Sequence, residues 1–264
     1  MATSDRIPPV RPAGAYPTAR AGATASIDQG LRSYMLRVYN YMAIGLAITG
    51  VAALAIMAIG TTTDPSMAVA QLRDGLYLTS VGSAVWLSPL RWVVILAPLA
   101  VVFLFSFRIQ TMSVGTAQAV FWLFAALMGL SLSSIFLVYT AESITRVFFI
   151  TAASFGALSL YGYTTSKSLS GWGSFLFMGL IGIIIASLVN LFIGSSALQF
   201  AISVIGVLVF AGLTAYDTQQ IKEMYFAGDD SASSGRKAIM GALRLYLDFI
   251  NLFTMLLSLF GNRN

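Results

Sequence analysis

Long stretches without any charged residue dominate the pattern of hydrophobic and polar positions along this chain. Four of them cover residues 38–63, 109–141, 147–166 and 168–216. A helix that spans a lipid bilayer needs about 20 mainly apolar residues, so each stretch is long enough to cross a membrane. The pattern therefore predicts an all-α, polytopic membrane protein.

Charged residues, prolines and Gly-Ser clusters divide the apolar sequence into seven expected spanning helices. These helices are expected near residues 38–60, 90–108, 115–139, 145–163, 172–193, 197–222 and 241–260. The fifth and sixth are separated at Ile193-Gly194-Ser195-Ser196, because the 49 uncharged residues from 168 to 216 are too many for one crossing.

Two segments lie outside this pattern. Residues 1–30 are rich in Pro, Gly, Ala, Ser and Thr and contain no apolar core of a signal peptide. We expect them to form a disordered cytoplasmic tail, followed by one transmembrane domain over residues 31–264. Residues 61–90 form a long outer loop, whose part 75–90 is apolar enough to lie on the membrane surface.

Composition narrows the chemistry that this membrane domain can perform. The chain is 58% hydrophobic and only 9% charged, and it contains neither cysteine nor histidine. Thiolate and imidazole sites are thereby excluded, so no transition-metal or haem cofactor is expected. No block rich in Lys and Arg indicates nucleic-acid binding. Carboxylates, hydroxyls and amides remain as candidate functional groups, and the lipid bilayer is the first expected partner.

The distribution of Lys and Arg predicts the orientation. With the amino terminus in the cytoplasm, eleven of the fifteen basic residues lie in inner segments and four in outer segments. Positively charged segments favour the cytoplasmic side. An odd number of helices then places the carboxyl terminus outside.

Two aspartates stand out because acidic residues are so scarce in the apolar part of the chain. Asp217 lies near the inner end of the sixth expected helix, and Asp248 lies about two turns into the seventh. Antiparallel neighbours can bring these side chains to similar depth. A charge inside a bilayer costs about 2.5–3.5 kcal/mol or more, so we expect the two carboxyls to share one proton and act as a pH sensor.

The same pair offers hard oxygen ligands that suit calcium. Thr214 and Asn251, each one turn away, could add neutral oxygens, and Arg108 lies at the inner end of its own helix. Simpler roles stay open. Asp217 could pair with Lys222 or solvent, Asp248 could pair with Arg244 at i,i+4, and Arg108 could be an inner-side anchor.

The segments AYDTQQIK (215–222) and LYLDFINLF (245–253) closely resemble the Bax inhibitor family, whose members carry the transmembrane Bax-inhibitor motif. The likeness extends through 159–193 and covers about residues 30–262, and the chain is identified as a bacterial-type member. The resemblance implies seven helices, with the last one central and wrapped by the other six. It also implies an integral protein of the bacterial inner membrane.

The resemblance further implies a pH-sensitive calcium leak. Asp217 and Asp248 match the pH-sensing pair, and Arg108 is the best match for an arginine that latches the closed state by pairing with the first aspartate. We expect protonation or the latch to close the pathway and deprotonation to open it. Calcium would be the transported or bound ion.

Other functions compete with this one. A non-conducting regulator that binds a membrane protease or a stress or cell-death partner is the main alternative, and a proton-coupled transporter is another. Aspartyl intramembrane proteases also carry a Tyr-Asp pair, as at Tyr216-Asp217. Their second aspartate follows Gly-x-Gly and precedes Pro-Ala-Leu, whereas Leu245-Tyr246-Leu247 precedes Asp248 and no proline follows Pro98. We therefore expect no enzymatic activity.

Overall fold

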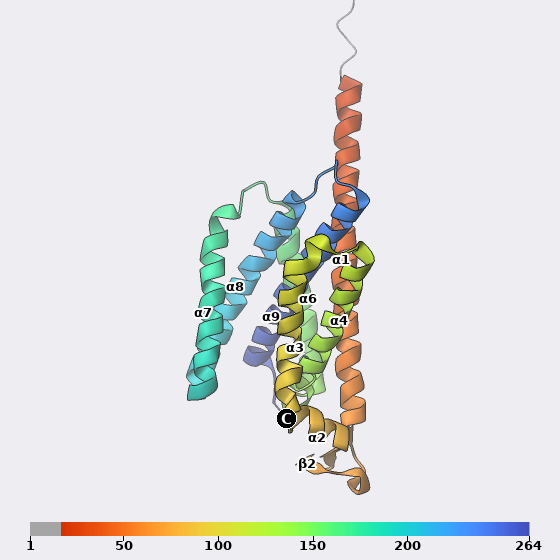
Figure 1. Cartoon of the computed structure of the whole chain (residues 1–264). Helices are drawn as coiled ribbons and strands as arrows, with labels where there is room; N and C mark the ends of the chain where they lie inside the picture. Colours follow the sequence, from red (N-terminus) through yellow and green to blue (C-terminus); the bar gives the residue numbers. More distant parts are fainter. Residues whose placement is uncertain (1–16, 264) are drawn as a thin grey trace, which may run out of the picture.

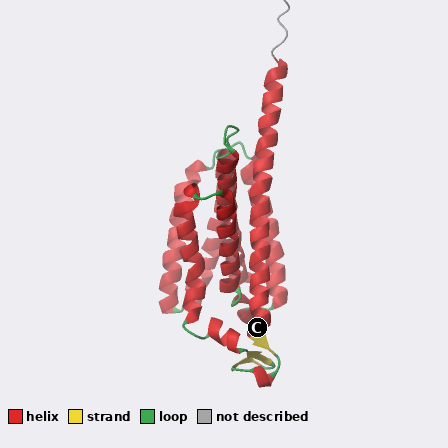
Figure 2. Cartoon of the chain, turned by 45° about the vertical axis from the view of Figure 1, so that its right-hand side comes forward, coloured by secondary structure: helices red, strands yellow, loops and turns green. Residues whose placement is uncertain are grey.

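The computed structural model describes residues 17–263 and shows a helical bundle with a small sheet at one end (Figures 1 and 2). The elements, in chain order, are α1 (Pro17–Gly60), β1 (Thr61–Thr62), η1 (Pro65–Met67), β2 (Ala70–Arg73), β3 (Leu76–Leu78), α2 (Ser80–Trp86), α3 (Leu90–Arg108), η2 (Ile109–Thr111), α4 (Val114–Leu132), α5 (Ile135–Val138), α6 (Ala141–Thr164), α7 (Ser170–Ile193), α8 (Ser196–Glu223) and α9 (Ser231–Phe260).

Seven helical segments among the described residues are long and apolar enough to cross a membrane, which confirms the expected number. They are Gln29–Gly60, Leu90–Thr111, Val114–Val138, Ala141–Thr164, Ser170–Ile193, Ser196–Glu223 and Ser231–Phe260. The division between α7 and α8 falls where the sequence places it. Gly194 ends α7 with φ +67°, a left-handed conformation that glycine adopts without steric cost.

Helix α9 is the centre of the bundle, as expected. In its most apolar window 56% of the residues are buried, against at most 39% in any other span. It packs against α1, α4, α6 and α8. Helices α3 and α7 form an outer layer, since α3 packs on α4 and α7 packs on α8. Phe192 and Met178 on α7 are largely exposed, as expected of side chains that face lipid.

Close helix contact brings α6 and α8 together near the candidate site. A Cβ atom on Gly162 of α6 would lie only 2.2 Å from the backbone oxygen of Ala215 on α8. Small residues permit such backbone contact, which is a main source of helix association in lipid. The contact lies two residues before Asp217, so it fixes the position of that part of α8.

The 61–90 loop is ordered and packs against the helix ends. Its three short strands form an antiparallel sheet in the order β1-β3-β2. Helix α2 follows, and the Trp86 indole N–H donates a hydrogen bond of 3.1 Å to Ser133. We call this end of the bundle the sheet side. The opposite end, at the top of Figure 1, carries the connectors 165–169 and 224–230 and is called the connector side.

Two helices extend further toward their amino ends than the sequence suggests. Helix α1 begins at Pro17, so the expectation of disorder does not hold for residues 17–30, and residues 1–16 lie outside the described part. Four alanines in residues 17–28 favour helix, and proline is favoured at the first helical position. Helix α9 begins at Ser231, ten residues before the expected start near 241, because Asp230 caps it.

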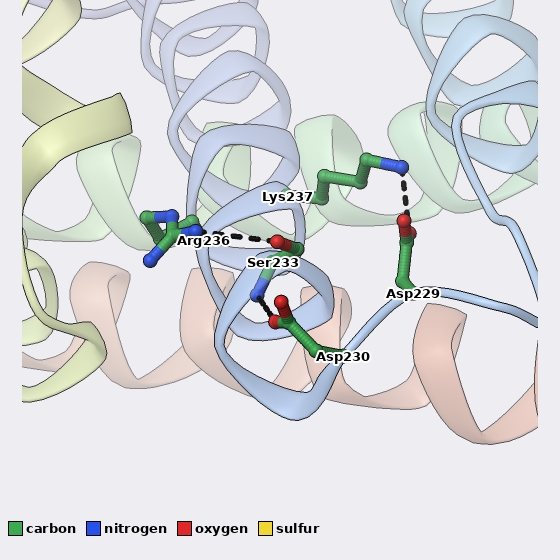
Figure 3. Close-up of polar contacts among 5 residues, drawn as sticks. All are labelled: Asp229, Asp230, Ser233, Arg236 and Lys237. Carbon is green, nitrogen blue, oxygen red and sulfur yellow. Dashed lines mark hydrogen bonds and ion pairs between the residues drawn. The ribbon is translucent and has the colours of Figure 1, made fainter.

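The start of α9 is fixed by the polar contacts in Figure 3. An Asp230 carboxylate oxygen accepts a hydrogen bond of 2.6 Å from the Ser233 backbone N–H. Lys237 forms an ion pair of 2.6 Å with Asp229, and Arg236 donates to the Ser233 hydroxyl. Arg236 also reaches the carbonyl oxygen of Met112, which ties α9 to the connector before α4.

Replacing Asp230 by alanine should lower the melting temperature of the purified protein by a few degrees, because the cap of α9 is lost. The hydrogen bonds from Ser233 hold the pKa of Asp230 below its usual value. The contribution of Asp230 to stability is therefore present above about pH 4 and lost as the pH falls further. Asp230→Asn is the control, since asparagine caps helices about equally well. Equal melting temperatures for the alanine and asparagine variants would contradict the role of the cap.

Candidate functional site

Asp217 and Asp248 meet in one cavity between α7, α8 and α9. The cavity has a volume of about 610 Å³, and both aspartates line it. The two carboxyl groups are close enough to act on each other electrostatically. Asp248 is only 5% exposed, whereas Asp217 is partly exposed. The structure thus brings together the two aspartates that the sequence places on adjacent antiparallel helices.

Helical periodicity explains which side chains line this cavity. On α9 the lining residues stand at i, i+3, i+4 and i+7, on one face of the helix. On α8 and α7 the lining residues also recur at intervals of about one turn. The lining residues are Gly173, Ser174, Phe177 and Leu180 from α7; Phe210, Leu213, Tyr216 and Asp217 from α8; and Arg244, Leu247, Asp248 and Asn251 from α9. The neighbouring face of α9, with Leu245, Tyr246 and Phe249, is buried in the bundle.

The carboxyl group of Asp248 does not make all the hydrogen bonds that it can. Among the described residues, its Oδ2 atom is buried and has no hydrogen-bond partner. A buried polar atom without a partner costs free energy, so such an atom calls for a proton, a cation or water. The arrangement therefore provides an acceptor that a ligand entering the cavity can use.

Arg244 supplies the positive charge nearest to the pair. It lines the same cavity, it is exposed, and its charge acts on both carboxyl groups. The i,i+4 ion pair between Arg244 and Asp248 is nevertheless not formed, since the only ion pair among the described residues joins Lys237 and Asp229. Arg244 can thus approach the pair without being fixed to either carboxylate.

Arg108 lies elsewhere in the structure. It is exposed at the end of α3, which packs on α4 and α2, and it does not line the cavity. Lys222 does not pair with Asp217 either; its ammonium group donates a hydrogen bond of 2.8 Å to the carbonyl oxygen of Tyr163. The structure therefore brings Arg244, and not Arg108, to the aspartates.

Of the two side chains expected to support the aspartates, Asn251 lines the cavity and Thr214 does not. Asn251 lines the cavity, and its side-chain N–H donates to the carbonyl oxygen of Leu247, which leaves its oxygen available as an acceptor. Thr214 is buried outside the cavity lining, and its hydroxyl donates to the carbonyl oxygen of Phe210 at 2.7 Å. Ser174 is a lining residue that the sequence does not single out, and Tyr216, which the sequence singles out only as half of a protease-like Tyr-Asp pair, lines the cavity as well.

A second polar group lies nearer the sheet side. The hydroxyls of Ser203 and Ser258 are 3.0 Å apart, and the side-chain N–H of Asn190 donates a hydrogen bond of 3.2 Å to the side-chain oxygen of Gln199. On α9, Asn251, Met255 and Ser258 stand at i, i+4 and i+7, and so on one face. Met255 packs against Gly206 of α8, with its sulfur 2.8 Å from the position of an added Cβ. An apolar contact therefore separates the aspartate cavity from these polar groups.

Two carboxylates are too few for a tight metal site. Among the described residues, no group of three acidic side chains that could hold a metal ion is present. Calcium usually takes six to eight oxygen ligands, so waters would have to complete its shell here. The arrangement fits a weakly held, exchanging cation or a proton better than a permanently bound metal.

Comparison with known proteins adds to this geometry. The family model described as "Inhibitor of apoptosis-promoting Bax1" matches residues 31–264. The chain belongs to the Bax inhibitor family. The Bax inhibitor match covers all seven spans except the first two residues of the first, and it includes both aspartates.

Bacterial relatives cover almost the same part of the chain. The chain is 49% identical over 236 residues to "Inner membrane protein YbhL" of Escherichia coli K12, which covers 89% of this chain and 93% of that protein. It is 47% identical over 240 residues to an uncharacterized protein of Caulobacter vibrioides, covering 90% and 92% of the two chains. An uncharacterized protein of Rickettsia prowazekii is 47% identical over 238 residues, covering 90% and 93%. This chain is thus an integral membrane protein of the Bax inhibitor family.

Proposed function

We propose that this protein is a pH-sensitive calcium leak channel, in which the Asp217–Asp248 pair controls passage through the α7–α8–α9 cavity. The observation that carries the proposal is the meeting of two carboxyl groups in a cavity, one of them with a buried oxygen that has no partner. Carboxylate oxygens are the ligands that calcium prefers. A weak site with few protein ligands also allows the ion to leave, which conduction requires.

The protonation state of the pair sets the charge of the cavity. With one shared proton the pair carries a single negative charge, and with none it carries two, which attract a divalent cation more strongly. Arg244 competes with the cation for the same carboxylates. We therefore assign the role of the closing arginine to Arg244 and expect deprotonation to open the pathway.

The contact between Met255 and Gly206 is the proposed barrier of the closed state. It lies between the aspartate cavity and the polar side chains of Ser203, Ser258 and Gln199. Hydrophobic constrictions of this kind close channels by excluding water. Shortening the Met255 side chain would leave polar groups on both sides of a widened gap.

Calcium flux into liposomes that contain the purified protein and a calcium indicator tests the proposal. The flux should rise as the pH rises, and Met255→Ala should raise the flux severalfold at the pH where the wild type is closed. Met178→Ala is the matched control, because Met178 is 70% exposed on the outer face of α7. Flux equal to that of protein-free liposomes at every pH would overturn the channel and favour the non-conducting regulator.

The expected orientation, with the amino terminus in the cytoplasm, is part of this proposal. It places the connector side, and with it Lys167, Lys222 and the basic start of α9, in the cytoplasm. Two single-cysteine variants test the orientation. A thiol reagent added outside intact cells should label Asp74→Cys but not Ser168→Cys. The reverse labelling pattern would contradict it.

A further inference from the structure

A second cavity opens on the lipid-facing surface between α1 and α6. It has a volume of about 700 Å³. Leu36 on α1 is 52% exposed and Leu160 on α6 is 62% exposed, so the two rims of this groove face the bilayer. The two helices are joined across the groove by a hydrogen bond of 2.7 Å between Tyr39 and Ser159. We call this cavity the α1–α6 groove.

The walls of the α1–α6 groove suit a hydrocarbon chain. Met35, Met42, Leu46 and Phe155 line it, and its lining residues include no acidic side chain. The hydroxyls of Tyr39 and Ser159 in its wall are already paired, with each other at 2.7 Å and, for Ser159, with Thr218 at 2.9 Å. Water needs two to four polar partners in a cavity, and a mainly apolar groove in which these two hydroxyls are already paired offers few of them.

The positive charges of the groove are at its connector-side end. Arg32 lines that end and makes no ion pair with any described residue. Lys222 is close by, because its ammonium donates to the carbonyl oxygen of Tyr163, another lining residue. The position of an added Cβ on Gly30, two residues before Arg32, contacts the Tyr225 side chain in the 224–230 connector. The basic end of the groove is therefore at the level of the connectors, where the membrane meets water.

The length of the groove matches one leaflet of a bilayer. Its lining residues on α1 run from Arg32 to Leu46, which is about 21 Å at 1.5 Å per residue. One leaflet with its headgroup region is about 20–22 Å thick. A phospholipid whose phosphate lies at Arg32 would thus extend its acyl chain to the end of the groove. Basic pockets between spanning helices are known to bind anionic headgroups.

We propose that the α1–α6 groove binds one anionic phospholipid, with an acyl chain along the apolar walls and the phosphate at Arg32. This site is separate from the Asp217–Asp248 cavity, and its existence does not depend on whether the protein conducts calcium. The positive charge of Arg32 favours an anionic headgroup, and the long apolar walls of the groove favour an acyl chain over water.

Native mass spectrometry of the full-length protein in detergent, titrated with phosphatidylglycerol or phosphatidylcholine, tests the headgroup preference. Wild type should retain phosphatidylglycerol preferentially. Arg32→Gln should bind it about fivefold more weakly, as expected for loss of one basic contact. Arg37→Gln is the matched control, because Arg37 is exposed on the same helix but does not line the groove.

A second pair of variants tests the groove itself. Gly156 lines the groove, and a Cβ there would meet no atom within 4 Å, so Gly156→Trp should place its ring in the groove and weaken the binding of phosphatidylglycerol. Gly182 on α7 is equally open, and Gly182→Trp should bind like the wild type. Equal binding of both lipids, or no difference within the two variant pairs, would overturn the proposal. A lipid-free dimer that dissociates in Gly156→Trp would show that a second copy fills the groove instead.

Discussion

Replacing Asp248 by asparagine should remove most of the pH dependence of calcium flux through the purified protein. If one shared proton controls the gate, the ratio of open to closed channels changes by up to about tenfold per pH unit. Asparagine cannot lose a proton, so the variant should stay in the low-flux state while the wild type opens with rising pH. Stopped-flow calcium entry into indicator-filled liposomes measures the effect.

Asp217→Asn should behave in the same way, because the two carboxyl groups act as a unit. Asp74→Asn is the control, since Asp74 is an exposed carboxylate in the sheet-side loop and does not line the cavity. Arg244→Gln should show the opposite effect and raise the flux at low pH. An unchanged pH profile in both aspartate variants, with the proteins folded, would contradict the proposed gate.

Replacing Gly162 by valine should cause a large loss of stability, about 3 kcal/mol or more. The added Cβ would lie 2.2 Å from the oxygen of Ala215 and 2.9 Å from its carbonyl carbon. These are backbone atoms, which cannot rotate away, so α6 and α8 would have to separate. The melting temperature in detergent and the yield of monodisperse protein measure the loss.

Gly156→Ala provides the matched control on the same helix. Because an added Cβ at Gly156 meets open space, the substitution should be neutral or stabilising by about 0.5–1 kcal/mol through helix propensity. Wild-type stability of Gly162→Val would mean that the α6–α8 contact is not needed for the fold.

The spans could be predicted from the sequence because the bilayer imposes their length and excludes charges from them. Gly194 marks the break between α7 and α8 for an equally local reason, its left-handed conformation. The start of α9 could not be placed in the same way. Residues 231–237 are mostly polar in sequence, and the Asp230 cap together with the contacts of Arg236 and Lys237 fixes the start of the helix there.

The aspartate pair could also be predicted. Two acidic side chains at similar depth on adjacent antiparallel helices are expected to face each other, because the lipid on the other sides does not accept a charge. The arginine partner could not. Arg108 and Arg244 both lie toward the connector side, and sequence gives the depth of a residue but not its direction around the bundle. Packing decides that direction: α3 lies on the outside of α4, whereas Arg244 is one turn from Asp248 on the face that lines the cavity.

The shared proton is the central claim, and infrared difference spectroscopy during a pH titration tests it most directly. The carbonyl stretch of a protonated carboxyl group, measured in reconstituted wild-type protein, should disappear as the pH rises through the range in which flux appears. The band should be altered or lost in both Asp217→Asn and Asp248→Asn. A titrating band that is identical in the wild type and both variants, or no such band in the wild type, would contradict the account.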